Sequence, residues 1–184
     1  MVEYEETLQI AKSKSDHGNR VQEFEPAIVE SLQNTDAQYP ALEIGNRDGG
    51  SATLILWHIY KENKGRKLIT CDTSDQPETI ASVAQRLGLD IPQHHKIIQR
   101  DFLRTDFLPT FGFVYLDADH DYNNVKADLS ILKLTKGAIV AVDDVESWPE
   151  LPQIDGLERI EYQVDEGRGG KGVHGHHIAF WRKI

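Results

Sequence analysis

From residue 41 onward, short apolar segments alternate with stretches that repeat apolar residues at helical spacing. Strands that alternate with helices of this length are typical of parallel strands joined by right-handed crossovers. Each expected strand ends close to a glycine or an aspartate, where an open α/β sheet binds its ligands. The five expected strands are Ala41–Ile44, Lys67–Cys71, Lys96–Gln99, Phe113–Leu116 and Ala138–Val142.

The intervening stretches carry the usual signals of helix starts and buried helix faces. Pro26 and Pro77 suit the first turn of a helix, and Ser51 can cap the helix that follows the first strand. Gly137 is expected to precede the fifth strand. Apolar residues fall on one face of each expected helix: Ile28, Val29 and Leu32; Ala52, Ile55, Leu56 and Ile59; Ile80, Val83, Ala84 and Leu87; Tyr122, Val125, Leu129 and Leu132.

After the fifth strand the pattern changes from helical to alternating. Ile160, Tyr162 and Val164 alternate with polar residues, as do Ile178 and Phe180, which predicts an antiparallel hairpin. The predicted fold is therefore a Rossmann-like α/β three-layer sandwich, whose mostly parallel seven-stranded sheet ends in a C-terminal antiparallel hairpin. Residues 1–40 are expected to form an N-terminal helical cap on a domain spanning residues 41–184, a single domain overall.

Composition narrows the class of partner and the compartment. The formal net charge of -10 argues against binding to a nucleic-acid backbone. The acidic first residues, Met1–Glu6, are not expected to form a signal peptide, and no stretch approaches the roughly 18 consecutive apolar residues of a membrane span. Cys71 is the only cysteine, which excludes an internal disulfide and favours the cytoplasm. The expected partner is a small-molecule substrate, and a homodimer is left open.

The loop after the first strand carries the first candidate site. Gly45, Gly49 and Gly50 allow a tight turn and the close approach of a ligand to backbone N–H groups. Glu43 is a carboxylate in an otherwise apolar strand, where a ligand ammonium group or its water shell would stabilise it. A plain turn with a capping carboxylate is the alternative, because short glycine motifs are weak signals.

Acidic residues at the next strand ends favour a nucleoside ligand. Asp72 lies 23 residues beyond Gly49, close to the spacing at which an acid accepts ribose hydroxyls. NAD fits less well, since Arg47 occupies a position where the dinucleotide motif has glycine. At the third strand end, Asp101 could accept a hydrogen bond from the amino group of an adenine, and Phe102 could stack on its ring. In the alternative, Phe102 packs in the core.

The densest acidic pattern follows the fourth and fifth strands. Asp117, Asp143 and Asp144 would meet in one cleft, where three carboxylates repel one another unless a cation such as Mg²⁺ bridges them. Asp119 and His120 lie beside that point, and either could remove a substrate proton. In the alternative interpretation these acids cap helices and His120 packs on the rim of the sheet.

Together these motifs resemble the class I S-adenosylmethionine-dependent methyltransferases, and most closely the small metal-dependent O-methyltransferases of the catechol, caffeoyl-coenzyme A and antibiotic-sugar types. The resemblance rests on the segments Glu43–Ser51, Asp117–Asp119 and Gly137–Asp144 and on the closing hairpin. It implies that residues 41–184 form the methyltransferase domain. The implied cofactor-binding residues are Glu43, Gly45, Asn46, Gly49, Ser51, Asp72, Thr73, Asp101, Phe102 and Asp117.

The resemblance further implies that Asp117, Asp143 and Asp144 bind the divalent cation. Asp119 or His120 would take the proton of a hydroxyl that attacks the sulfonium methyl group. A metal-independent methyltransferase with an oxygen or nitrogen acceptor, and a non-catalytic nucleoside-binding protein, are the alternatives. We expect the glycine- and histidine-rich segment 167–177 to be a hairpin loop, and we expect no metal site there.

Overall fold

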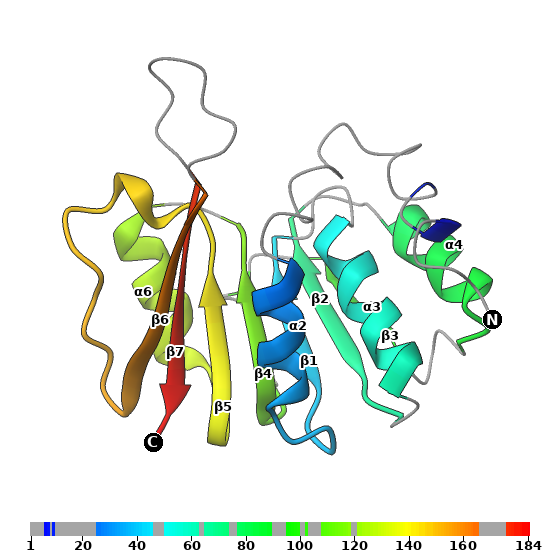
Figure 1. The fold of residues 1–184 in the computed structure, drawn as a ribbon, viewed down its shortest axis with the longest axis horizontal. Coiled ribbons are helices and arrows are strands. Elements are labelled where there is room, and N and C mark those ends of the chain that lie inside the picture. Colours follow the sequence, from blue (N-terminus) through cyan, green and yellow to red (C-terminus); the bar gives the residue numbers. More distant parts are fainter. Residues whose placement is uncertain are drawn as a thin grey trace.

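The computed structural model contains one sheet with helices on both of its faces (Figure 1). It describes residues 6–7, 9, 25–45, 50–62, 65–73, 77–89, 95–99, 102, 108–118, 121–165 and 176–184. Among these residues, seven strands form the sheet: β1 (Ala41–Ile44), β2 (Leu68–Asp72), β3 (His95–Gln99), β4 (Phe111–Leu116), β5 (Leu134–Val142), β6 (Leu157–Asp165) and β7 (His176–Lys183). They pair in the order β3-β2-β1-β4-β5-β7-β6. Within the same residues, no helix combines the length and apolar character needed to cross a bilayer.

Strands β1 to β5 pair in parallel, and β7 pairs antiparallel with both β5 and β6, as the sequence predicts. Strand β7 lies between β5 and β6, so the closing hairpin joins the sheet through its second strand.

Helices cover the sheet from both sides and complete the three-layer Rossmann-like arrangement. Helices α2 (Glu25–Gln33), α3 (Gly50–Glu62) and α4 (Pro77–Arg86) pack in one core cluster on one face. Helix α6 (Tyr122–Ile131) packs in a second cluster on the opposite face. A short 3-10 helix, η2 (Val145–Ser147), follows β5. Figure 1 shows α2 and α3 in front of the sheet and α6 behind it.

Burial on both faces explains the near-continuous apolar strands of the sequence. In β4, Phe113 and Tyr115 belong to the cluster beneath α2 and α3, while Val114 and Leu116 belong to the cluster beneath α6. The fully buried Trp181 and the nearly buried Trp57 also lie in these cores. Of the three tryptophans, only Trp148 retains substantial exposure at the sheet's carboxyl end.

Strand β5 differs from its expected start. It begins at Leu134 rather than at Ala138, and Gly137 lies within it at a φ of 78°. The pairing of β4 with β5 shifts register between Phe111 and Phe113, which forms a bulge that a positive-φ glycine accommodates. Two helix boundaries also differ from the expected ones. Helix α3 begins at Gly50, before the expected cap Ser51, and α6 ends at Ile131, before Leu132.

A half-buried histidine on α3 makes the stability of the fold depend on pH. Burial, together with a smaller contribution from the positive charge of Lys61, lowers the pKa of His58 to about 4. The unfolded chain therefore binds a proton between about pH 6.5 and 4 that the folded chain does not bind. We expect the free energy of unfolding to fall by about 1–2 kcal/mol across this window as the pH decreases, allowing for solvent screening.

Urea unfolding at pH 7 and pH 4.5 measures this effect, with His58→Gln as the comparison. The variant should lose less stability than the wild type on acidification, since glutamine has no proton to gain. An equal loss of stability in both proteins would show that other groups cause the acid sensitivity.

Candidate functional site

The carboxyl ends of four strands lie level at one edge of the sheet. The N–H of Gly45 donates to the Cys71 carbonyl at 2.8 Å, and that of Asp117 donates to the Ile44 carbonyl at 2.8 Å. The N–H of Asp143 donates in turn to the Leu116 carbonyl at 2.9 Å. These bonds place the ends of β2, β1, β4 and β5 side by side. Strand order reverses between β1 and β4, which is where open α/β sheets bind ligands.

Gly45 packs directly on the backbone that follows β4. A Cβ atom at this position would lie 2.2 Å from the carbonyl oxygen of Asp117 and 2.3 Å from Cα of Ala118. Its φ of 84° also lies in the region that side chains rarely adopt. The glycine motif after β1 and the acidic motif after β4 are therefore in contact, and only glycine fits between them.

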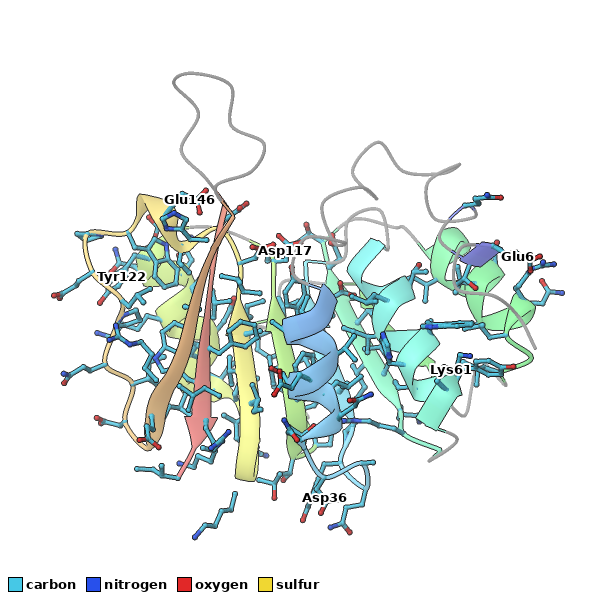
Figure 2. The ribbon with its side chains drawn as sticks, in the orientation of Figure 1. Glu6, Asp36, Lys61, Asp117, Tyr122 and Glu146 are labelled. Atoms are coloured by element: carbon cyan, nitrogen blue, oxygen red, sulfur yellow. The ribbon has the colours of Figure 1, made fainter. Side chains whose placement is uncertain are left out.

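The carboxylates of this edge lie on the face that α2 and α3 cover. Glu43 is registered with Tyr115, and parallel neighbours in register point to the same side of the sheet. Asp117 and Asp143 each lie two residues beyond a residue of the same core cluster, Tyr115 and Ala141, so they share this face. Glu43 is 0% exposed, whereas Asp117 and Asp143 are partly exposed at the edge. Figure 2 shows Asp117 at the upper end of β4.

Two protein donors hold the carboxylate of Asp143. The Tyr115 hydroxyl donates to Oδ2 at 2.8 Å, and the backbone N–H of Asp144 donates to Oδ1 at 3.0 Å. Burial raises the pKa of the Tyr115 hydroxyl well above its ordinary value, and the negative charges of Asp143, Asp117 and Glu43 raise it further. The phenol therefore stays protonated and remains a hydrogen-bond donor at neutral pH.

The expected three-carboxylate metal group is not formed. Among the described residues, which include Asp117, Asp143 and Asp144, no three histidine, cysteine or acidic side chains are arranged to hold a metal ion. The two oxygens of Asp143 are directed at protein donors. Asp144 has a left-handed backbone, with φ 54° and ψ 39°, so its side chain leaves the chain in a different direction from an extended residue.

The other sequence-predicted residues fall into three groups. Asp72 is partly exposed at the end of β2, and Thr73 after it is exposed. Phe102 is 3% exposed within the core cluster that includes α6, which is the alternative that the sequence left open. The residues that lie outside the described part of the chain are Asn46, Arg47, Gly49, Asp101, Asp119, His120 and most of segment 167–177; of Ser51, only its place in α3 is described.

One acid of the segment 117–121 has a structural role. The side chain of Asp121 accepts hydrogen bonds from the N–H groups of Asn123 and Asn124, at 2.9 and 3.2 Å, and thereby caps α6. Sequence reasoning gave this capping role to the acids as a group and did not single out Asp121. The edge-to-face pair of Tyr122 and Trp148, with ring centroids 5.5 Å apart, lies beside this cap.

Tyr115 and Glu146 are the residues of this edge that sequence reasoning missed. A carboxylate oxygen of Glu146 accepts the N–H of His177 at 3.3 Å, which links η2 to the start of β7. Figure 2 shows Glu146 at the same end of the sheet as Asp117. The signal for Tyr115 was available, because a tyrosine in a buried strand needs a partner for its hydroxyl.

Comparisons with known proteins agree with this geometry. A family model described as a methyltransferase domain matches residues 42–145. This range begins in β1 and ends just after β5, so it contains every strand end of the site. No curated protein sequence matches the chain.

Solved structures of two methyltransferases match the fold across almost the whole chain. One is the O-methyltransferase TomG from Streptomyces achromogenes, in complex with S-adenosylmethionine; the TM-score is 0.63 at 14% identity, covering 100% of this chain and 91% of that one. The other is the N-methyltransferase NodS from Bradyrhizobium japonicum, in complex with S-adenosylhomocysteine; the TM-score is 0.58 at 15% identity, covering 96% and 98%. At these identities, the two structures establish the fold alone.

Proposed function

This chain belongs to the methyltransferase-domain family of class I S-adenosylmethionine-dependent methyltransferases, and we propose that it methylates a hydroxyl group of a small molecule. The observation that carries the proposal is the convergence of Gly45, Asp117 and Asp143 where the strand order reverses. Fold alone does not identify a reaction, so the proposal depends on the side chains at this edge.

We assign Glu43, Gly45 and Asp72 to the cofactor. Glu43 is a fully buried carboxylate, which an ammonium group or its water shell would stabilise. Asp72 is a partly exposed acid one strand away, and a carboxylate can accept two ribose hydroxyls. When bound, S-adenosylmethionine supplies a methyl group on a positively charged sulfur. The further cofactor contacts that we propose are Asn46, Gly49, Ser51, Thr73, Asp101 and Asp117.

The acceptor would lie over the ends of β4 and β5. There the carboxylates of Asp117 and Asp143 can accept hydrogen bonds from its hydroxyl groups and orient them. As the acceptor oxygen forms its bond to the methyl carbon, the bond from that carbon to sulfur breaks. The hydroxyl proton passes to Asp119 or His120, and the enzyme contributes mainly the alignment of the two reactants.

The family resemblance also implies a divalent cation in the site. The described residues do not fit one, because Asp117, Asp143 and Asp144 form no three-ligand group. The proposed transfer therefore uses the side chains of the chain itself. We propose a small molecule as the substrate, and neither a nucleic acid nor a membrane as a partner. The boundary of the N-terminal cap at residue 40, the cytoplasmic location and a homodimer remain predictions.

Calorimetric titration with S-adenosylmethionine tests the cofactor assignment. We expect wild-type protein to bind it, and Glu43→Gln to bind it about tenfold or more weakly, because the substitution removes a buried negative charge. The exposed Glu158 on β6 provides the matched control, and Glu158→Gln should bind as the wild type does. Titrations with and without Mg²⁺ should give equal affinities.

Two results would contradict the proposal. A wild-type protein that binds neither S-adenosylmethionine nor S-adenosylhomocysteine would not be an active methyltransferase. Turnover that requires Mg²⁺ would restore the metal-assisted reaction. Mass spectrometry after incubation with S-adenosylmethionine and a pool of cell metabolites then identifies the acceptor, and the methylated atom distinguishes oxygen from nitrogen.

A further inference from the structure

Tyr115 lies in the buried interior of the sheet, and its hydroxyl reaches the acidic edge through a hydrogen bond. Its ring belongs to the core beneath α2 and α3 and is 2% exposed, while its hydroxyl contacts Asp143 at 2.8 Å. The rigid strand β4 thus supports the acidic side chain at the end of β5. Such support from a packed side chain fixes the orientation of a site residue.

The hydrogen bond also stabilises the backbone turn that follows β5. Asp143 uses Oδ2 for Tyr115 and Oδ1 for the N–H of Asp144. Asp144 is the only described non-glycine residue with positive φ, and left-handed backbone is unfavourable for a residue with a side chain. A carboxylate held by Tyr115 is in place to stabilise that turn through the Asp144 N–H.

Three carboxylates surround the Tyr115 hydroxyl closely enough to influence its ionisation, namely Asp143, Asp117 and Glu43. Of these, Asp143 alone receives its described hydrogen bond. The hydroxyl has one proton to donate, and it donates that proton to Asp143. Asp143 therefore differs from an ordinary surface carboxylate, because a side chain of the buried core fixes its position.

We propose that Tyr115 is a positioning residue for methyl transfer: its hydroxyl fixes the carboxylate of Asp143, and with it the Asp144 turn, on the acceptor side of the site. This inference rests on the proposed function for its catalytic consequence. The contact itself, from Tyr115 through Asp143 to the Asp144 N–H, is independent of that function.

The variant Tyr115→Phe tests the proposal, since it removes one oxygen atom and retains the ring. We expect kcat to fall on the order of tenfold to a hundredfold, because small misplacements of orienting groups slow transfer strongly. The Kd for S-adenosylmethionine should stay within about twofold, since Glu43 and Asp72 are unchanged. The matched control is Tyr60→Phe on α3, whose ring contacts Trp57, and it should leave both values unchanged.

A double-mutant cycle separates positioning from general stabilisation. If Tyr115 acts through Asp143, then Tyr115→Phe should add nothing to the loss of kcat in Asp143→Ala. Additive losses would overturn the proposal, as would a Tyr115→Phe protein with wild-type kcat. If Tyr115→Phe does not fold, Asp143→Ala must itself lower kcat without weakening S-adenosylmethionine binding, and a normal kcat there would refute the proposal.

Amide hydrogen exchange tests the contact without any turnover. The Asp144 N–H should exchange about threefold or more faster in Tyr115→Phe than in the wild type, while amides within β4 keep their rates. Unchanged exchange at Asp144 would contradict the inference even if the chain proves to be a methyltransferase. Faster exchange in a protein that binds no S-adenosylmethionine would instead contradict only the proposed function.

Discussion

Replacing Gly45 by alanine should abolish detectable S-adenosylmethionine binding and lower the free energy of unfolding by about 3 kcal/mol or more. The added Cβ would overlap the carbonyl oxygen of Asp117 and Cα of Ala118, at 2.2 and 2.3 Å. Both are backbone atoms, so no side-chain rotation can relieve the overlap. The end of β1 would have to move away from the end of β4, which separates the cofactor side of the site from the acceptor side.

Gly88→Ala is the matched control for this variant. Gly88 also has a positive φ, 68°, but a Cβ there would meet no atom within 4 Å. Its substitution should therefore cost only the backbone strain, about 1–2 kcal/mol, and leave cofactor binding intact. Urea unfolding and calorimetry measure both effects. If Gly45→Ala bound S-adenosylmethionine normally, the close contact between the β1 and β4 ends would not be essential to the site.

Replacing Arg66 by alanine should lower the free energy of unfolding by about 3–5 kcal/mol. The guanidinium is 2% exposed and donates through Nη1 to the Leu32 carbonyl at 3.1 Å and to the Thr35 hydroxyl at 3.0 Å. It thereby joins the end of α2 to the start of β2. Alanine would leave the Leu32 carbonyl without this bond and would open a cavity where the long side chain lay.

The exposed arginine of α4 provides the control. Arg86 pairs with Glu6 at 2.6 Å, but the two side chains are 46% and 52% exposed, so Arg86→Ala should cost about 0–1 kcal/mol. Hydrogen bonds from Gln38 lower the pKa of Asp36, and the charge of nearby Arg66 lowers it to a smaller extent. Asp36 lies at the opposite end of the molecule from Asp117 in Figure 2. Folded Arg66→Ala should therefore bind S-adenosylmethionine normally. Equal destabilisation by both substitutions would contradict this account.

Most of the fold could be predicted from local patterns. The alternation of strand and helix signals predicted β1 to its exact bounds, and it located β2, β3 and β4 to within two residues. The change to alternating residues after Val142 correctly predicted the antiparallel hairpin. The start of β5 could not be read in this way. Gly137 is normally a strand breaker, and only the register shift between β4 and β5 places it in a bulge.

The candidate site was predictable in its location but not in its contacts. The acids at the strand ends were expected to share one edge, and the structure brings the strand ends at Asp117 and Asp143 side by side, since parallel strands bring their carboxyl ends together. The sequence could not reveal that the carboxylate of Asp143 binds Tyr115, which lies 28 residues earlier. Nor could it show that Asp144 adopts left-handed backbone. The described residues do not support the expected sharing of one cation by Asp117, Asp143 and Asp144, because proximity at an edge does not specify side-chain direction.

Local chemistry therefore determined the element types, the ends of the strands and the family resemblance that residues 42–145 bear out. These depend on periodicity and on residues close together in the chain. The tertiary structure decided which carboxylate is buried, which one is held by Tyr115, and why Gly45 must lack a side chain. Each of these depends on the register between segments distant in sequence, and pairing across a sheet is set by the packing of the whole core.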